Sequence, residues 1–277
     1  MLYFYLVAAA VLIPFLDRFT GILHTPNSWW ICPLLYIGFA IGLIALHFLV
    51  VVTAVQLVNV NKPAERFSRF YRKAISLTLP MFFKMAGVHI HTDGLDKVPQ
   101  DTRFLFVCNH LDNFDPVVIM SVLPDAELGF VGKKEIYEKM KFVSKAMHKL
   151  HGLPIDRENN REAAKTIIKA VNLIKEDKVS IGIFPEGYAS TTGELLPMRN
   201  GAFKIAYKAD VPIVVAAISG TKKIVKNMFR RRTDVYFDVL EVIPRETLGE
   251  LNSTELGDKV TEIMLEGTKI QREKLEK

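Results

Sequence analysis

Cysteine is scarce in this sequence, and charge is almost absent from its first 58 residues. Cys32 and Cys108 are the only cysteines among the 277 residues, and both lie within apolar segments. Two such residues cannot form a disulfide framework or a zinc site, so the composition indicates a reducing compartment such as the cytoplasm. Asp17 and Arg18 are the only Asp, Glu, Lys or Arg residues before position 59. This lack of charge is typical of segments that enter a membrane.

Two apolar segments account for the missing charge. Residues 1–16 are apolar throughout, and residues 29–58 form a run of 30 residues without Asp, Glu, Lys or Arg. As a helix the longer run would extend roughly 45 Å, which exceeds the hydrocarbon thickness of about 30 Å, so it can span a bilayer if it tilts. The first segment is short for a span and lacks the basic start of a cleaved signal peptide. We expect residues 1–60 to form a membrane-anchoring helical hairpin that crosses the bilayer or enters one leaflet.

The residues after the hairpin predict its orientation. Residues 61–76 are basic and contain a single acid, Glu65. Their basic residues are Lys62, Arg66, Arg69, Arg72 and Lys73. By the positive-inside rule this side, and residues 61–277 with it, should face the cytoplasm. Trp29 and Trp30, at the start of the second apolar segment, suit the membrane interface.

The chain as a whole is basic and apolar. It carries a formal net charge of +6 and is 49% hydrophobic, which favours anionic membrane surfaces or phosphate-bearing substrates over nucleic acid. Residues 221–232 contain six Lys or Arg side chains and no acid. This cluster is either a solvated surface or a surface that docks on anionic headgroups, and no nucleic-acid recognition motif accompanies it.

From about residue 87 onward, apolar strands alternate with amphipathic helices. Strands are predicted at 88–94, 103–109, 128–133, 179–187, 211–219 and 234–243. Helices are predicted at 116–124, 134–150, 160–177, 201–210 and in the tail from 253. Asn159 or Asn160 can cap the third of these helices, and Ser253 or Thr254 the last. The alternation predicts a single α/β domain.

The strand at 103–109 leads into "NHLDNFDP", in which His110 precedes Asp115 by five positions. On a continuing strand the two side chains would lie about 16 Å apart, and on one helix they would diverge by about 140°. They can meet only if the chain turns between them. Pro116 favours such a turn, because it suits the first turn of a helix and pushes Asp115 out of helical geometry.

Two interpretations of this pair remain open on the residues alone. Asp115 can be a simple helix cap with His110 in a loop, or its carboxylate can orient the His110 ring as a general base. Cys108 offers a rival nucleophile, although its neighbours indicate a small buried hydrophobe. His89 and His91 share one face of a strand and could form a metal pair, but solvent-facing polar positions on an edge strand are the ordinary explanation.

Three further segments accompany the His–Asp segment in a fixed order. "NHLDNFDP" is followed by "HGLPIDR" (151–157), "FPEG" (184–187) and "VPIVVAAI" (211–218). Together they resemble the four motifs of the glycerolipid acyltransferases, the superfamily of 1-acyl-glycerol-3-phosphate acyltransferases, over residues 60–245. The resemblance implies that residues 61–277 form an α/β acyltransferase domain with a single mixed sheet and flanking helices.

The resemblance also implies roles for individual residues. Acyl transfer from a thioester to an alcohol needs a base for the hydroxyl group and an anchor for the acceptor's phosphate. By resemblance, His110 would remove the hydroxyl proton and Asp115 would orient its ring. The residues implied in acceptor binding are Arg157, Glu186, Gly187, Lys133 and Arg199. Because the thioester is already activated, no metal or organic cofactor is expected, and acyl-CoA or acyl carrier protein would be the co-substrate.

The chain departs from the family pattern at two places. The family's third motif usually continues with Thr-Arg-Ser, whereas Tyr188, Ala189 and Ser190 stand here. A hydroxyl and a cation that commonly lie near the acceptor phosphate are therefore missing. Pro154 also replaces a residue that is often bulky and apolar or aromatic. These departures put the identity of the acceptor in doubt, but not the class of reaction.

Together these features predict a membrane-anchored acyltransferase whose catalytic domain faces the cytoplasm. Its expected partners are membrane lipids, a lysophospholipid acceptor and the acyl donor, but not nucleic acid. The expected acceptor is 1-acyl-glycerol-3-phosphate and the product phosphatidic acid. The alternatives are another lysophospholipid or lipid alcohol as acceptor, a lipid hydrolase that uses water or Cys108, and a non-catalytic membrane-binding protein.

Overall fold

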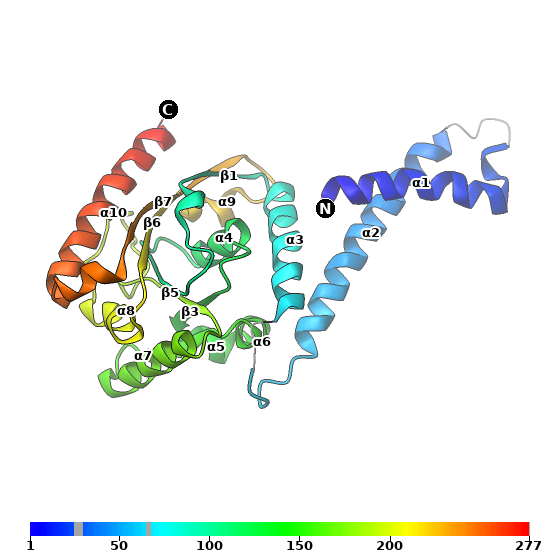
Figure 1. Cartoon of the computed structure of the whole chain (residues 1–277). Coiled ribbons are helices and arrows are strands. Elements are labelled where there is room, and N and C mark those ends of the chain that lie inside the picture. The colour runs from blue at the N-terminus through cyan, green and yellow to red at the C-terminus, as the bar shows by residue number, and fades with distance from the viewer. Residues whose placement is uncertain (25–29, 65–67, 277) are drawn as a thin grey trace. The chain divides into compact units, whose positions relative to one another are not determined.

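The computed structural model describes residues 1–24, 30–64 and 68–276. The chain forms two compact units, Met1–Val58 and Asn59–Lys277 (Figure 1). Three residues named above, Trp29, Glu65 and Arg66, lie outside the described residues.

The first unit contains two long apolar helices, α1 (Leu2–Thr20) and α2 (Ile31–Gln56). They pack against each other, and the Tyr5 hydroxyl lies 2.8 Å from Nδ1 of His47 between them. Both helices are long and apolar enough to cross a membrane, and the only buried residues on them are Tyr5, Ala9, Ala40 and Val55. Apolar side chains left this exposed need a cover other than this unit, for which lipid is suited.

The second unit is built on a mixed sheet of seven strands in the order β1-β7-β6-β2-β5-β3-β4. All neighbouring strands are parallel except β6 and β7, which are antiparallel. The strands are β1 (Val88–Asp93), β2 (Leu105–Cys108), β3 (Leu128–Lys133), β4 (Leu153–Ile155), β5 (Ser180–Ile183), β6 (Ile213–Ser219) and β7 (Thr233–Ile243). The prediction of an α/β fold with one mixed sheet is confirmed.

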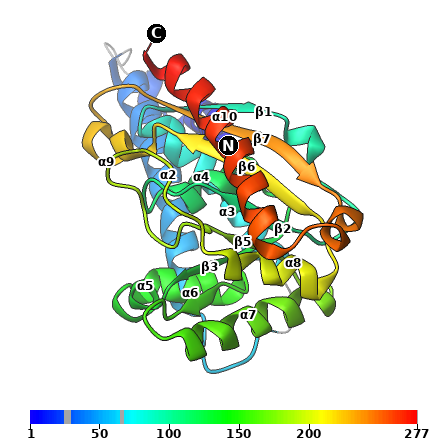
Figure 2. The same ribbon diagram turned by 90° about the vertical axis from the view of Figure 1, so that its left-hand side faces the viewer.

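Helices cover both faces of this sheet. They are α3 (Arg69–Met85), α4 (Asp115–Val122), α5 (Lys134–Lys139), α6 (Lys141–Lys149), α7 (Asn160–Lys175), α8 (Lys204–Ala209), α9 (Ile224–Asn227) and α10 (Ser253–Glu276). Helix α10 lies across β6 and β7 (Figure 2). Side chains alternate across the pleat, so Leu105 and Val107 of β2 enter the core under α7, α8 and α10. Phe106 and Cys108 enter the other core, under α3 and α4.

Two local predictions are wrong. The helix expected over 134–150 is two helices, because the backbone leaves helical geometry at Met140 (φ −108°, ψ 80°). The last helix is capped by Asn252 rather than by Ser253 or Thr254: its Oδ1 accepts from the amides of Thr254 and Glu255. The Glu255 carboxylate accepts from the Asn252 amide in return, which completes a capping box.

Other local features follow the sequence. Asn159, one of the two candidate caps, caps α7 by accepting from the amides of Arg161 and Glu162. Strand β1 is an edge strand, as the solvent-facing histidines suggested. His91 bonds Asp234 on β7 through Nε2 at 2.7 Å and stacks on Tyr236. In the described parts of the chain no three His, Cys, Asp or Glu side chains gather in a group that could hold a metal ion.

Candidate active site

The carboxyl ends of three adjacent parallel strands bring the candidate residues together. β2 pairs with β5 on one side and with β6 on the other, all in parallel. Residues that follow these strands therefore leave the sheet at the same edge, which is where open α/β sheets usually bind ligands. His110 follows β2, Glu186 follows β5 and Thr221 follows β6.

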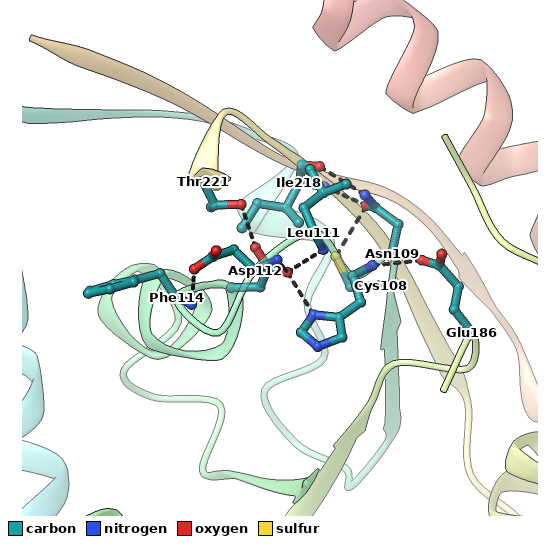
Figure 3. A network of polar contacts seen from close by, with 10 residues as sticks. Cys108, Asn109, Leu111, Asp112, Phe114, Glu186, Ile218 and Thr221 are labelled. Atoms are coloured by element: carbon teal, nitrogen blue, oxygen red, sulfur yellow. Dashed lines mark hydrogen bonds and ion pairs between the residues drawn. The ribbon is translucent and has the colours of Figure 1, made fainter. Parts of the chain in front are cut away.

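Asn109 directly follows strand β2 and fixes the start of the loop. Its side-chain amide donates to the Ile218 carbonyl at 3.0 Å, and its Oδ1 accepts from the Ile218 amide at 2.8 Å. The buried side chain thus takes over the pairing with β6 that the backbone of β2 gives up (Figure 3). The next residue, His110, begins the loop at a defined position.

The structure brings His110 and Asp115 into contact. Nδ1 of His110 lies 2.8 Å from Oδ2 of Asp115, whose side chain is fully buried, while that of His110 is 12% exposed. The carboxylate can only accept, so this nitrogen carries the proton and Nε2 keeps its lone pair. The ring also stacks on Phe184, with 4.3 Å between ring centroids. A bond and a stack hold the imidazole in one orientation.

Asp115 performs a different local task from the helix cap that the sequence allowed. It is the first residue of α4, with Phe114 at the cap position. Its Oδ2 accepts from the backbone amides of Leu111 (2.6 Å) and Asp112 (2.8 Å), which belong to the loop before the helix. The carboxylate therefore closes the His110–Asp115 loop on itself instead of satisfying the free amides of its own helix.

Thr221 completes the surroundings of the carboxylate and was not predicted. Its buried hydroxyl donates to Oδ1 of Asp115 at 2.6 Å. Asp115 thus accepts four hydrogen bonds from the protein, from two amides, one imidazole and one hydroxyl (Figure 3). A buried charge is tolerated where such donors replace its hydration. A polar residue directly behind a buried parallel strand was the available sequence signal.

Glu186 holds the backbone of the same loop. Its two carboxylate oxygens accept from the amides of His110 (2.7 Å) and Leu196 (2.8 Å), and only 3% of the residue is exposed. Burial raises the pKa of this carboxyl, and the two amide bonds oppose the rise. These contacts are those of a positioning residue, whereas the acceptor-binding role implied by the resemblance stays a prediction.

Arg157, Arg199 and Gly187 gather around Tyr188. The guanidinium carbons of Arg157 and Arg199 lie over the Tyr188 ring, 5.4 and 5.2 Å from its centroid. Gly187 has φ +79°, and a Cβ there would lie 2.8 Å from Nε of Arg199, so glycine lets the arginine cross the backbone. Lys133 ends β3 and forms an exposed ion pair with Glu135 at 3.6 Å, and the charge of Glu135 also acts on Arg157.

Cys108 is a core residue, as its neighbours indicated. The side chain is fully buried, and its only polar contact among the described residues is Oδ1 of Asn109 at 3.7 Å. Burial raises the pKa of the thiol well above 9.0. A thiol that stays protonated and is covered by α4 and the sheet is not a nucleophile.

Comparison with known proteins relates the sequence to acyltransferases. The family described as Acyltransferase matches residues 89–219. A 1-acyl-sn-glycerol-3-phosphate acyltransferase of Bacillus subtilis is 31% identical over 154 residues, which are 55% of this chain and 71% of the relative. Proteins of the same name from Salmonella typhimurium and Haemophilus influenzae are 31% and 33% identical. Those matches cover 55% and 59% of this chain but only 60% and 62% of the relatives.

A solved structure has the same fold. The crystal structure of the 1-acyl-sn-glycerophosphate (LPA) acyltransferase PlsC from Thermotoga maritima matches with a TM-score of 0.61 and 21% sequence identity. The match covers 83% of this chain and 95% of that one. At this identity the likeness concerns the fold.

Proposed function

Because the chain belongs to the family of 1-acyl-sn-glycerol-3-phosphate acyltransferases, we propose that it transfers a fatty acyl group to the free hydroxyl of 1-acyl-glycerol-3-phosphate. The donor is a thioester, acyl-CoA or acyl carrier protein, and the product is phosphatidic acid. The single observation that carries the proposal is the His110–Asp115 contact at 2.8 Å, with Nε2 left as a base.

The reaction follows from this geometry. Nε2 of His110 takes the proton of the acceptor hydroxyl while the oxygen attacks the thioester carbonyl carbon. The Asp115 carboxylate stabilises the imidazolium that forms, because it already accepts the Nδ1 proton. When the tetrahedral intermediate collapses, the C–S bond breaks and His110 returns the proton to the thiolate. The new ester and the free thiol leave, and the imidazole is again neutral.

The two helices of the first unit complete the proposal. We propose that α1 and α2 anchor the enzyme in the membrane and that Asn59–Lys277 faces the cytoplasm. The length and apolarity of the helices and the basic residues that follow them support this topology. Lysophospholipids reside in the same bilayer, so an anchored enzyme meets its acceptor without extracting it into water.

The direct test measures thioester consumption by the purified full-length protein with a panel of lysolipid acceptors. We expect turnover with 1-acyl-glycerol-3-phosphate, no dependence on added metal, and no change with a chelator. Comparison of acyl-CoA with acyl carrier protein identifies the donor. Absence of turnover with every phosphate-bearing acceptor would defeat the assignment. Turnover confined to another lysophospholipid would keep the reaction class and change the acceptor.

Removing the Thr221 hydroxyl should slow acyl transfer without unfolding the protein. Thr221→Val keeps the shape but deletes the 2.6 Å bond to Asp115, and hydrogen bonds to charged groups contribute about 1.5–3 kcal/mol. We expect kcat to fall about tenfold or more, with KM for the acceptor little changed. Thr221→Ser is the matched control, since it keeps a donor. An unchanged kcat for Thr221→Val would show that this bond does not support the His–Asp pair.

Cys108→Ala separates this proposal from a thiol hydrolase. We expect kcat within about twofold of the original enzyme, because a buried cysteine behaves as a small hydrophobe. In a Cys32→Ala background, a thiol reagent at pH 8 should leave Cys108 unmodified until the protein unfolds, in keeping with the raised pKa of the thiol. Loss of activity in a folded Cys108→Ala enzyme would instead favour the hydrolase.

A further inference from the structure

Two cations without carboxylate partners meet at one aromatic ring. Arg157 and Arg199 both lie over Tyr188, and among the described residues neither guanidinium lies within 4.0 Å of an acid. The polar contact of Arg199 is a 3.4 Å bond from Nη1 to the Arg157 carbonyl. The half-buried Arg157 donates no side-chain hydrogen bond within the described parts of the chain. Its donors are therefore available to a ligand.

Tyr188 is itself held in place at several points. Its hydroxyl donates to Oε1 of Glu158 at 2.7 Å, so the ring is tied to the loop that carries Arg157. On either side of it, the segment 186–190 is bonded to His110. The His110 amide donates to Glu186, and the Ser190 amide donates to the His110 carbonyl at 2.8 Å. The ring and its two arginines therefore lie in a segment anchored to the candidate base.

Such a pair of cations is suited to a doubly charged ligand. The pKa of Arg157 is lowered from its ordinary value, chiefly by burial, and Arg199 adds to the effect while Tyr188 and Glu135 oppose it. An anion between the two guanidiniums would relieve their repulsion. A phosphate monoester carries about −1.5 to −2 charges at pH 7, whereas a phosphate diester carries only one. Two planar forks match the several oxygens of the monoester.

We propose that Tyr188 is a specificity-determining positioning residue, which holds Arg157 and Arg199 together so that the site selects acceptors with a phosphate monoester. This inference rests on the proposed function. It also explains how the chain works without the usual Thr-Arg after the third motif: Arg199, carried across Gly187 onto the ring, supplies the second cation. Tyr188 does not contact the phosphate itself. Its aromatic ring supports the two arginines that would contact the phosphate.

The test compares two acceptors with the same acyl chain in the full-length enzyme: lysophosphatidate, a monoester, and lysophosphatidylglycerol, a diester. Tyr188→Ala should raise KM for the monoester roughly 5- to 30-fold, since each cation–π contact contributes modestly. KM for the diester, and kcat for both, should change less than about threefold, because the His–Asp pair is untouched. Tyr188→Phe keeps the ring and should restore most of the lost selectivity. Tyr236→Ala removes a comparable contact, with Lys274 over the ring on β7, and should change neither KM.

Binding of glycerol 3-phosphate, measured by calorimetry, separates this inference from the proposed function. Tyr188→Ala should weaken this binding by the same factor as it raises KM. If the original enzyme turns over no lysolipid yet binds glycerol 3-phosphate in a Tyr188-dependent way, the proposed function fails and the inference stands. If Tyr188→Ala raises KM equally for both acceptors, or changes neither KM nor binding, the inference is wrong. Melting temperatures of all variants show whether they are folded.

Discussion

Replacement of His110 by alanine is expected to lower kcat for acyl transfer by about three orders of magnitude, with KM for lysophosphatidate little changed. General bases contribute typically 10²- to 10⁴-fold, and this imidazole is the base that the Asp115 carboxylate orients. The fold should survive, because Asp115 keeps three of its four donors, from Leu111, Asp112 and Thr221. Steady-state kinetics of the purified variant, with its melting temperature, measure both effects.

The chain contains its own control for this experiment. His91 bonds Asp234 at 2.7 Å and stacks on a ring, just as His110 bonds Asp115 at 2.8 Å and stacks on Phe184. The His91–Asp234 pair joins β1, the edge strand, to β7, whereas the candidate active site follows β2, β5 and β6. The Asp234 carboxylate is partly exposed. His91→Ala should leave kcat within about twofold. A His110→Ala enzyme that retains a tenth or more of the original kcat would remove the base from the mechanism.

The two histidines also show what the sequence could and could not predict. The His110–Asp115 contact is local: a spacing of five positions and a proline that favours a turn made it one of two interpretations that the residues allowed, and the family resemblance favoured it. The His91–Asp234 contact joins residues 143 positions apart, and it depends on which strand pairs with the edge strand. The local periodicity of a sequence predicts where strands lie, but not which strands pair with each other. A sequence shows two histidines on one strand face, but not the carboxylate that pairs with one of them.

The same distinction holds for the support of the site. Thr221 and Asn109 reach their partners across 106 and 109 positions, through the pairing of β2 with β6. Their partners could be found only after the sheet was assembled, although their positions behind buried strands were visible. Glu186 was also found from its motif, and the acceptor-binding role that the motif implies stays a prediction. Its bonds to the amides of His110 and Leu196 were not predicted, because they depend on how the segment after β5 packs against the loop after β2.

Arg157 and Arg199 were predicted from motifs, but their relation was not. They stand 42 positions apart and meet through Tyr188, a residue that drew attention only as a departure from the family pattern.

Main-chain turns were also harder to predict than strands. The break at Met140 follows no proline or glycine, and both flanking segments have helical composition.

Asp115→Asn is expected to lower kcat by about 10³- to 10⁴-fold, because the amide reverses the polarity of the site. The carboxylate accepts from four donors, whereas an asparagine side chain offers one acceptor oxygen and places an NH₂ donor against the others. If that NH₂ faces His110, the imidazole must present a lone pair at Nδ1, and Nε2 then carries the proton. The base is lost although the ring remains. The unsatisfied donors should also lower the free energy of unfolding by about 1–3 kcal/mol.

Asp112→Asn is the matched control, since among the described residues this partly exposed carboxylate of the same loop accepts only from the Phe114 amide at 3.0 Å, a bond that asparagine can also accept. We expect its kcat within about threefold of the original. The double variant His110→Ala/Asp115→Asn decides how Asp115 acts. If Asp115 works only through the ring, the double variant should be no slower than His110→Ala alone, since residues that act as a unit are not additive. If kcat of the double variant falls by the product of the two single effects, the carboxylate acts on the reaction independently of His110. The His–Asp pair would then not be a single catalytic unit.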